Sequence, residues 1–304
     1  MIQGVLLHSV SYAGLWGQKS LPVIEFLRKA ASLGYDGVEL MAKRPHVSIL
    51  DYDAGARREL RSQINGLGLR HNVIAGYTNL TADMEHGEVP HREIQVSYMA
   101  ELARLAQDLG STAVRIFTGY ENPAADFPRQ WRLVVDTLRE AAKRASDCGV
   151  ILGVQNHHDV GVGWESFRDI ILEVDHPNCR AMFDAWAPAL HECGHTSSSL
   201  RESARQLAPL NIHTTIADYQ LRPRYKYNAA LINYEPHTPA VVAVPMGEGF
   251  IDYTSFLEGF REGGFSGTVA YEMCSPIRGG GSEENLDRFA KRFLDWIAPF
   301  RKNI

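Results

Sequence analysis

Short runs rich in β-forming residues alternate with longer amphipathic stretches along the whole chain of 304 residues. Eight runs stand out: GVLLHSV (4–10), DGVELM (36–41), LRHNVIA (69–75), AVRIFTG (113–119), VILGVQN (150–156), RAMFD (180–184), NIHTTIA (211–217) and GTVAYEM (267–273). Most of the stretches between them have helical periodicity, as in 21–34, 96–110 and 131–149. Eight alternating units with no linker between them are typical of a (β/α)8 barrel. We therefore predict a single TIM-barrel domain over 1–304 and disfavour a doubly wound sheet, which usually has fewer strands.

The regular spacing of the runs is interrupted once, between the seventh and the eighth. The segment 219–249 is rich in Pro, Tyr and Arg, and we predict a long loop there. Long loops in compact domains usually serve as lids, binding loops or interface segments. A homo-oligomer built through this loop is one expectation. Arg222, Arg224 and Lys226 are candidates to bind a phosphate or carboxylate, the alternative being a solvated loop face.

Composition excludes several classes of protein. The net charge is −5 and the basic residues are not clustered, which argues against a nucleic-acid partner. No apolar run approaches the roughly 18 residues of a membrane span, and the N-terminal residues do not have the pattern of a signal peptide. Cys148, Cys179, Cys193 and Cys274 are scattered and contain no CxxC pair, so we expect reduced thiols and a cytoplasmic protein.

Polar side chains gather where the predicted strands end, which is where a barrel of this kind has its active site. The residues concerned are His8, Glu39, Arg115, the run Gln155 to Asp159, Asp184, His213 and Glu272. Two carboxylates and an imidazole, from Asp184, Glu272 and His213, suit Mn²⁺, Mg²⁺, Co²⁺ or Zn²⁺, with Gln155 as a fourth oxygen donor. The alternative is that each residue makes its own isolated hydrogen bond.

The chain resembles the xylose-isomerase-like TIM barrels, a group that includes ketose 3-epimerases and inosose dehydratases. The matching stretches are LGYDGVEL (33–40), AVRIFTGY (113–120), VQNHHD (154–159), FDAWAP (183–188), PMGEGFIDYTSFLEGFREGGFSG (245–267) and YEMCSP (271–276). The resemblance implies a divalent metal, most often Mn²⁺, held by Glu, Asp, His and Glu on strands 5 to 8. It also implies a sugar or polyol substrate whose proton is removed next to a metal-polarised carbonyl.

Two positions depart from the family pattern. Gln155 stands where the family usually has glutamate. On strand 7 the spacing His-x-x-Asp would place the histidine at Thr215, three residues before Asp218. His213 lies two residues earlier and shares a strand face with Thr215, so we predict that it takes the ligand's place.

Glutamine at 155 removes one negative charge and one possible base. We expect Glu272 and His157 to do acid–base chemistry next to Gln155, in an isomerase or epimerase acting on a sugar or keto-sugar. The same reasoning favours, as an alternative, a lyase or dehydratase that cleaves a 3-keto-glycoside, including a C-glycoside, with a histidine base. Two further alternatives are a phosphate-ester nuclease, which the acidic charge disfavours, and a non-catalytic sugar-binding relative.

Five residues are candidates for contact with a small carbohydrate substrate. Glu39 is an acid on strand 2, Trp16 and Trp186 are aromatic faces for a sugar ring or an aglycone, and His158 and Arg222 are polar. The alternatives are core packing for the tryptophans, a polar partner at the barrel floor for Glu39, a loop cap for His158 and a solvated loop face for Arg222.

Overall fold

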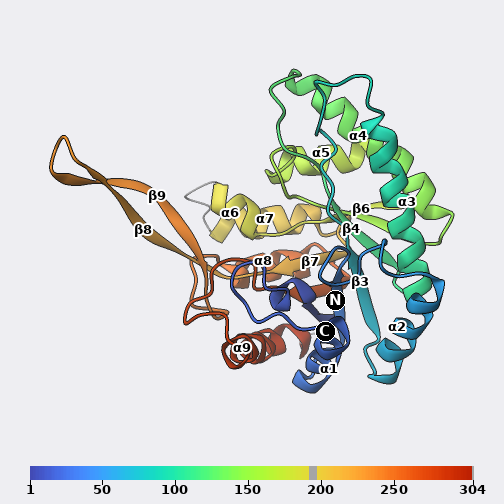
Figure 1. The fold of residues 1–304 in the computed structure, drawn as a ribbon, viewed down its shortest axis with the longest axis horizontal. Helices are drawn as coiled ribbons and strands as arrows, with labels where there is room; N and C mark the ends of the chain where they lie inside the picture. The colour runs from blue at the N-terminus through green and yellow to red at the C-terminus, as the bar shows by residue number, and fades with distance from the viewer. Residues whose placement is uncertain (192–196, 303–304) are drawn as a thin grey trace.

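The computed structural model describes residues 1–191 and 197–302, and a barrel of parallel strands lies at its centre (Figure 1). The barrel strands are β1 (Ile2–His8), β2 (Gly37–Met41), β3 (His71–Ala75), β4 (Ala113–Phe117), β5 (Ile151–Gln155), β6 (Cys179–Met182), β7 (His213–Ile216) and β10 (Gly267–Tyr271). Their hydrogen-bonded order is β6-β5-β4-β3-β2-β1-β10-β7. The edges β6 and β7 approach through a parallel bridge between Ala181 and Asn211, and Ile212 N–H donates to the Ala181 carbonyl at 3.0 Å. The predicted eight-stranded barrel is confirmed, and each strand falls within one of the eight runs or within two residues of it.

Helices follow the barrel strands and pack around the outside of the barrel (Figure 1). They are the 3-10 helix η1 (Ser9–Tyr12), α1 (Val23–Leu33), α2 (Ala54–Gly66), α3 (His91–Leu109), α4 (Phe127–Ser146), α5 (Trp164–Val174), α6 (Trp186–His191), α7 (Ser197–Leu207), α8 (Tyr253–Glu262) and α9 (Glu283–Lys302). None of the helices in the described ranges combines the length and apolar character of a membrane span. Cys148, Cys179 and Cys274 are free thiols, whereas Cys193 lies outside the described residues.

Strand alternation decides which side chains enter the barrel. On β1, Val5 and Leu7 pack in the main core between the sheet and the helices. Leu6 points the other way, into a small cluster with Val73, Ala113, Met182 and Ala270 from other strands. That apolar cluster fills the barrel around the middle of these strands. The polar residues that follow it on the same strand faces therefore lie above it, towards the C-terminal ends.

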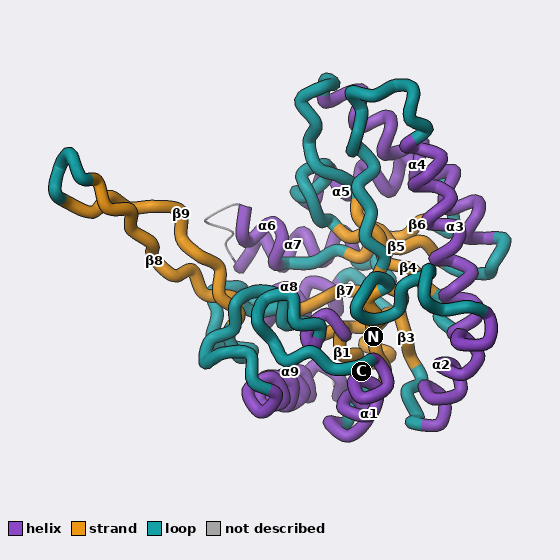
Figure 2. Tube along the Cα trace, viewed as in Figure 1, coloured by secondary structure: helices purple, strands orange, loops and turns teal. Residues whose placement is uncertain are grey.

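The segment predicted as a long loop is a β-hairpin. Strands β8 (Tyr219–Asn228) and β9 (Asn233–Ala243) pair antiparallel from Tyr219–Ala243 to Asn228–Asn233, and the hairpin projects far from the barrel (Figures 1 and 2). The sequence pattern predicts a long loop and no strands here, because three prolines within 219–243 obscure the β-forming Tyr, Thr and Val residues. Proline is tolerated in a two-stranded ribbon, since each strand has one edge that needs no partner. Residues 219–243 are called the arm below.

Candidate active site

Because side chains alternate between the two faces of a strand, several strands each place one polar side chain inside the barrel, near the C-terminal ends of the strands. Glu39 on β2 lies between the outward-facing Val38 and Leu40, and Arg115 on β4 lies between Val114 and Ile116. The same pattern turns inward the side chains of His8, Gln155, Asp184, Thr215 and Glu272. All seven residues are at most 5% exposed. Charged groups this deeply buried must be paired or neutral.

Glu39 is the anionic centre of this group. Its Oε1 lies 3.3 Å from Arg115 Nε and 3.6 Å from His8 Nε2, and its Oε2 lies 3.3 Å from His213 Nε2. Burial works to raise the pKa of the Glu39 carboxyl, but its interactions with His8, His213 and Arg115 outweigh burial and lower the pKa to about 2. Burial lowers the pKa of His8 to about 3, so that imidazole is neutral near pH 7. Glu39 therefore acts as the counter-ion of Arg115.

A line of hydrogen bonds runs from Arg115 through Gln155 to Asp184. Arg115 Nη1 donates to Gln155 Oε1 at 2.6 Å, and Gln155 Nε2 donates to Asp184 Oδ2. The amide thus presents its oxygen to a cation and its nitrogen to an anion. This arrangement uses both ends of a glutamine, and a carboxylate could not reproduce it.

Asp184 is held in place by several donors. Its Oδ1 accepts from the Thr215 main chain at 2.7 Å and from Thr214 Oγ1 at 3.1 Å, and its Oδ2 also accepts from Trp186 Nε1 at 3.1 Å. Burial nevertheless raises the pKa of Asp184 to about 6. The carboxylate joins β6 to β7 and orients the Trp186 ring.

Glu272 follows β10 and is the carboxyl group that reaches the cavity. Its Oε1 accepts from the Cys274 thiol at 3.0 Å, and that sulfur lies 2.9 Å from the Tyr219 hydroxyl. Its Oε2 lies 3.8 Å from His8 Nε2. Burial raises the pKa of Glu272 to about 8, and the nearby charges of Glu39 and Asp184 add to this effect. A carboxyl group with this acidity can accept or donate a proton near neutral pH.

A cavity of about 700 Å³ opens above these residues at the C-terminal ends of the strands. Its walls are mainly aromatic and include Trp16, Tyr77, Phe117, Tyr120, Trp186 and Tyr219. Its polar lining includes His8, Lys43, Arg115, His157, His158 and Glu272. Apolar walls with a few convergent polar groups are characteristic of small-molecule sites, and this volume falls in their usual range.

The two histidines after β5 play different parts in the cavity wall. The His158 main-chain N–H donates to His157 Nδ1 at 2.8 Å, so a neutral His157 ring has its proton on Nε2. The ring packs edge-on against Phe117 and Trp186. His158 adopts φ +69°, and its ring stacks on that of Tyr120 with the ring centroids 3.8 Å apart. Burial lowers the pKa of His158 to about 4. His157 is therefore placed to donate a hydrogen bond, and His158 to shape the wall.

Most of the chain matches a known family. A family model described as "xylose isomerase-like TIM barrel" matches residues 27–293. The chain belongs to this family. Among curated proteins, the fructoselysine 3-epimerases of Escherichia coli O157:H7 and Shigella flexneri are 27% identical over 144 residues, which cover 45% of this chain and 50% of theirs. The match thus spans about half the length of these relatives.

Several solved structures share the fold of this chain. D-psicose 3-epimerase from Clostridium cellulolyticum H10, solved with D-tagatose, superposes with a TM-score of 0.73 at 18% identity, covering 98% of this chain and 99% of that one. An L-ribulose 3-epimerase gives a TM-score of 0.71 at 17% identity, covering 99% and 94%. At these identities the likeness establishes the barrel, and the chemistry has to be argued from the side chains.

The structure separates the site residues predicted from the sequence into three groups. Those that line the cavity are Trp16, His157, His158, Trp186 and Glu272. Those buried beneath the residues that line the cavity, each in contact with neighbouring side chains, are Glu39, Gln155, Asp184 and His213. Arg222 is exposed near the base of the arm and is not among the cavity-lining residues. The roles of these residues remain predictions.

Sequence reasoning missed several cavity residues. Tyr77 and Lys43 follow β3 and β2, and Lys43 Nζ lies 3.8 Å from the Tyr77 ring centroid. Tyr219 and Cys274 form the chain of contacts that ends on Glu272. Position relative to a strand end is the signal that could have found them, since each lies within three residues of a barrel strand.

The side chains predicted to hold a divalent metal do not fit one as they are arranged. The oxygen of Gln155 accepts from Arg115, and all the contacts of Asp184 described above come from hydrogen-bond donors. His213 sits at the start of β7, with Nδ1 2.7 Å from Thr268 Oγ1 and Nε2 facing Glu39. Within residues 1–191 and 197–302, one group of three potential metal ligands has its ligand atoms within 4.8 Å of one another. It consists of Asp83, Glu85 and His86, and none of them lines this cavity. The Mn²⁺ site implied by the family therefore gains no support from these contacts.

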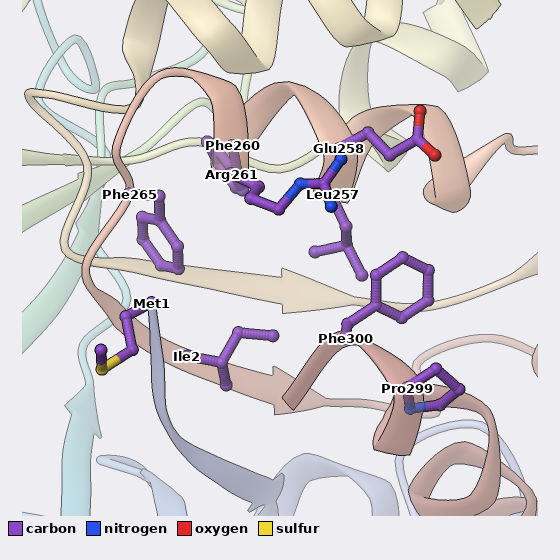
Figure 3. A pocket seen from close by; sticks show the side chains of 9 residues that line it. All are labelled: Met1, Ile2, Leu257, Glu258, Phe260, Arg261, Phe265, Pro299 and Phe300. Atoms are coloured by element: carbon purple, nitrogen blue, oxygen red, sulfur yellow. The ribbon is translucent and has the colours of Figure 1, made fainter. Parts of the chain in front are cut away.

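A second cavity, of about 270 Å³, lies near the start of β1, between α8 and the end of α9 (Figure 3). Its lining is mainly apolar, from Ile2, Leu257, Phe265 and Phe300 among others. Its charged side chains are Glu258 and Arg261, and Figure 3 shows Glu258 pointing away from the hollow. It lies far from the strand ends where this fold places its chemistry.

Proposed function

We propose that this protein is an isomerase or epimerase that acts on a sugar or keto-sugar by removing a proton from the carbon next to a carbonyl group. The observation that carries this proposal is Glu272, a buried carboxyl group with a pKa raised to about 8 that lines an aromatic-walled cavity. An efficient general base has a pKa near the working pH. The names of the relatives, which are 3-epimerases of ketoses and of fructoselysine, support this class of reaction.

The cavity walls provide the means to hold the substrate. Sugar rings present apolar C–H faces that pack on aromatic rings, and Trp16, Trp186 and Tyr219 offer such surfaces. His157, with its proton on Nε2, can donate a hydrogen bond to a carbonyl or hydroxyl oxygen. In an isomerase, Glu272 would take the proton from the hydroxyl-bearing carbon and return it to the neighbouring carbonyl carbon, while the hydroxyl proton moves to the former carbonyl oxygen. In an epimerase, a second group would instead deliver a proton to the opposite face of the deprotonated carbon.

The test is deuterium exchange. Ketoses such as D-fructose, D-tagatose and D-psicose, together with fructoselysine, would be incubated with the wild-type protein in D2O. Incorporation at the carbon next to the carbonyl would be followed by mass spectrometry. We expect exchange with at least one of these substrates and its loss in Glu272→Gln. Exchange that persists in the variant at the wild-type rate would show that Glu272 is not the base.

The width of the aromatic wall also supports a second candidate, a lyase that acts on a 3-keto-glycoside. Six aromatic rings line the cavity, more than one sugar ring would cover. In this reaction Glu272 takes the C2 proton, the C2–H electrons form the C1=C2 bond, and the C1 substituent leaves with its bonding electrons and takes a proton from water, while His157 Nε2–H donates a hydrogen bond to the substrate. Release of the aglycone, detected by chromatography, would distinguish this reaction from epimerisation.

We further propose that the arm contacts a second copy of the chain, within a cytoplasmic homo-oligomer. The arm has Arg222, Arg224 and Lys226 against Glu235, a net charge of +2, so the rest of the chain, whose total is −5, carries −7. Exposed acidic residues lie on loops at the cavity end of the barrel, where Asn122 donates to Glu85 at 3.1 Å and so joins the β3–α3 and β4–α4 loops. These loops, in a second copy, are the proposed docking place for the basic arm.

A further inference from the structure

We propose that the guanidinium of Arg115 takes the place of a divalent cation in this barrel, so that proton abstraction here is stabilised by an arginine and needs no metal. The chemical part of this inference rests on the proposed function. The part concerning metal exclusion rests on contacts alone and can be tested without a substrate.

The first step is the position of Arg115. The residue is 3% exposed, lies on β4 and lines the main cavity. Its Nη1 is bound to Gln155 and its Nε faces Glu39 Oε1 at 3.3 Å, whereas the buried Nη2 has no hydrogen-bond acceptor among the residues that the structure describes. A buried guanidinium with unused N–H groups beside a cavity is costly unless a ligand accepts from them. The unused donors therefore indicate a ligand oxygen that carries negative charge.

The second step is the pairing of Gln155 with Asp184. A glutamate at 155 would put two carboxylates in contact, and such a pair repels unless a cation lies between them. Glutamine removes that need, because its Nε2–H group binds Asp184 directly. Its oxygen then accepts from Arg115 at 2.6 Å. Gln155 and Arg115 together thus do what a glutamate and a metal ion would do at these positions.

The third step is the balance of charge around the cavity floor. Arg115 has Glu39 as its ionised partner, and Lys43 adds a second cation beside Tyr77. Burial and the charge of Arg115 lower the pKa of Lys43, which shows that the two cations are close enough to repel. An anionic oxygen entering the cavity would relieve this repulsion.

The reaction then needs only groups of this chain and the substrate. The base removes a proton from carbon, the C–H electron pair forms a C=C bond, and the carbonyl π electrons move to oxygen, giving an enolate. The Nη2–H groups of Arg115 donate to that oxygen, where fixed donors stabilise developing charge. Return of the proton to carbon reverses these electron shifts and restores the carbonyl.

The test measures uptake of Mn²⁺ alone. Wild-type protein and the variants R115M, Q155E and R115M/Q155E would be dialysed against chelator and then against Mn²⁺. Metal content would be measured by inductively coupled plasma mass spectrometry, and folding by circular dichroism. R57M is the matched control, because Arg57 is a largely buried arginine paired with Glu101 and Asp108 on the outer helices. We expect no Mn²⁺ in the wild type or in R57M, and about one equivalent in the double variant, whose site gains a carboxylate and loses the guanidinium.

One equivalent of Mn²⁺ in the wild-type protein would overturn the inference, and so would the absence of uptake by a folded double variant. The exchange assay separates this result from the proposed function. We expect wild-type exchange to change less than twofold with chelator present. If no substrate exchanges while the metal results are as expected, the proposed function fails and the exclusion of metal by Arg115 stands.

Discussion

At the residue scale, the chemistry depends on Glu272, which is 5% exposed and faces the cavity. Replacing it by glutamine keeps the size of the side chain and removes the base. We expect Glu272→Gln to lower the rate of deuterium exchange by about 100-fold or more, the usual contribution of a general base. Glu25→Gln, on the exposed face of α1, is the matched control and should leave the rate unchanged. An equal loss in both variants would point to an effect on folding.

The acidity of Glu272 predicts a pH profile. Because the base must be ionised and its pKa is raised to about 8, we expect kcat/KM to rise with pH and to level off above about pH 8. Below that point the ionised fraction, and with it kcat/KM, falls about tenfold per pH unit. Steady-state rates between pH 5 and pH 9 would measure this profile. A profile that is flat from pH 6 upward would mean that Glu272 titrates near its ordinary range and that burial does not set its acidity.

Individual residues were predictable from sequence where strand alternation was sufficient to place them. Asp184 and Glu272 follow barrel strands, and both point inward as expected. His213 shares the inward face, but it starts β7 and contacts Glu39 and Thr268, one layer below the cavity. Periodicity gives the face of a strand and not the height along the barrel axis, which depends on where each strand begins. For the same reason the contact between Arg115 and Gln155 could not be predicted.

At the element scale, the connection between β9 and α8 depends on Asp218. Its carboxylate Oδ2 accepts from Gly247 and Gly249 main-chain N–H groups, both at 2.9 Å. A Cβ atom on Gly249 would lie 1.8 Å from Asp218 Oδ1. This explains the second glycine of the GEG sequence, because a side chain would displace the carboxylate that closes the base of the arm.

We expect Gly249→Ala to destabilise the protein by about 2 kcal/mol, as forced overpacking commonly does, and so to lower the midpoint of thermal unfolding. Gly66→Ala is the control, because a Cβ there meets no atom within 4 Å and alanine favours the helix. Its midpoint should stay the same or rise slightly. Circular dichroism on both variants would measure the difference. Equal midpoints would show that the loop moves away from Asp218 without cost.

At the scale of the whole molecule, eight alternating units predicted the barrel, but nothing in them predicted the arm. The barrel follows from buried apolar strands that must be covered by helices. A hairpin standing alone is marginally stable in water, so its packing cannot be inferred from a local pattern. Of the fifteen large hydrophobic residues that are exposed in the described ranges, five lie between Tyr225 and Tyr234. That concentration points to a surface covered by another molecule.

Replacing residues 223–239 by an Asn-Gly turn would test whether the molecule that covers the arm is a second copy of this chain. We expect light scattering coupled to gel filtration to give a multiple of 33.9 kDa for the wild type and a mass near one chain for the shortened protein. The triple variant R222E/R224E/K226E should weaken association at least about tenfold, since complementary charges would become like charges. Three reversals at exposed sites on the outer helices, R58E/K143E/K291E, are the control and should leave the mass unchanged. A monomeric wild type, or a shortened protein that still associates, would show that the arm does not bind a second copy.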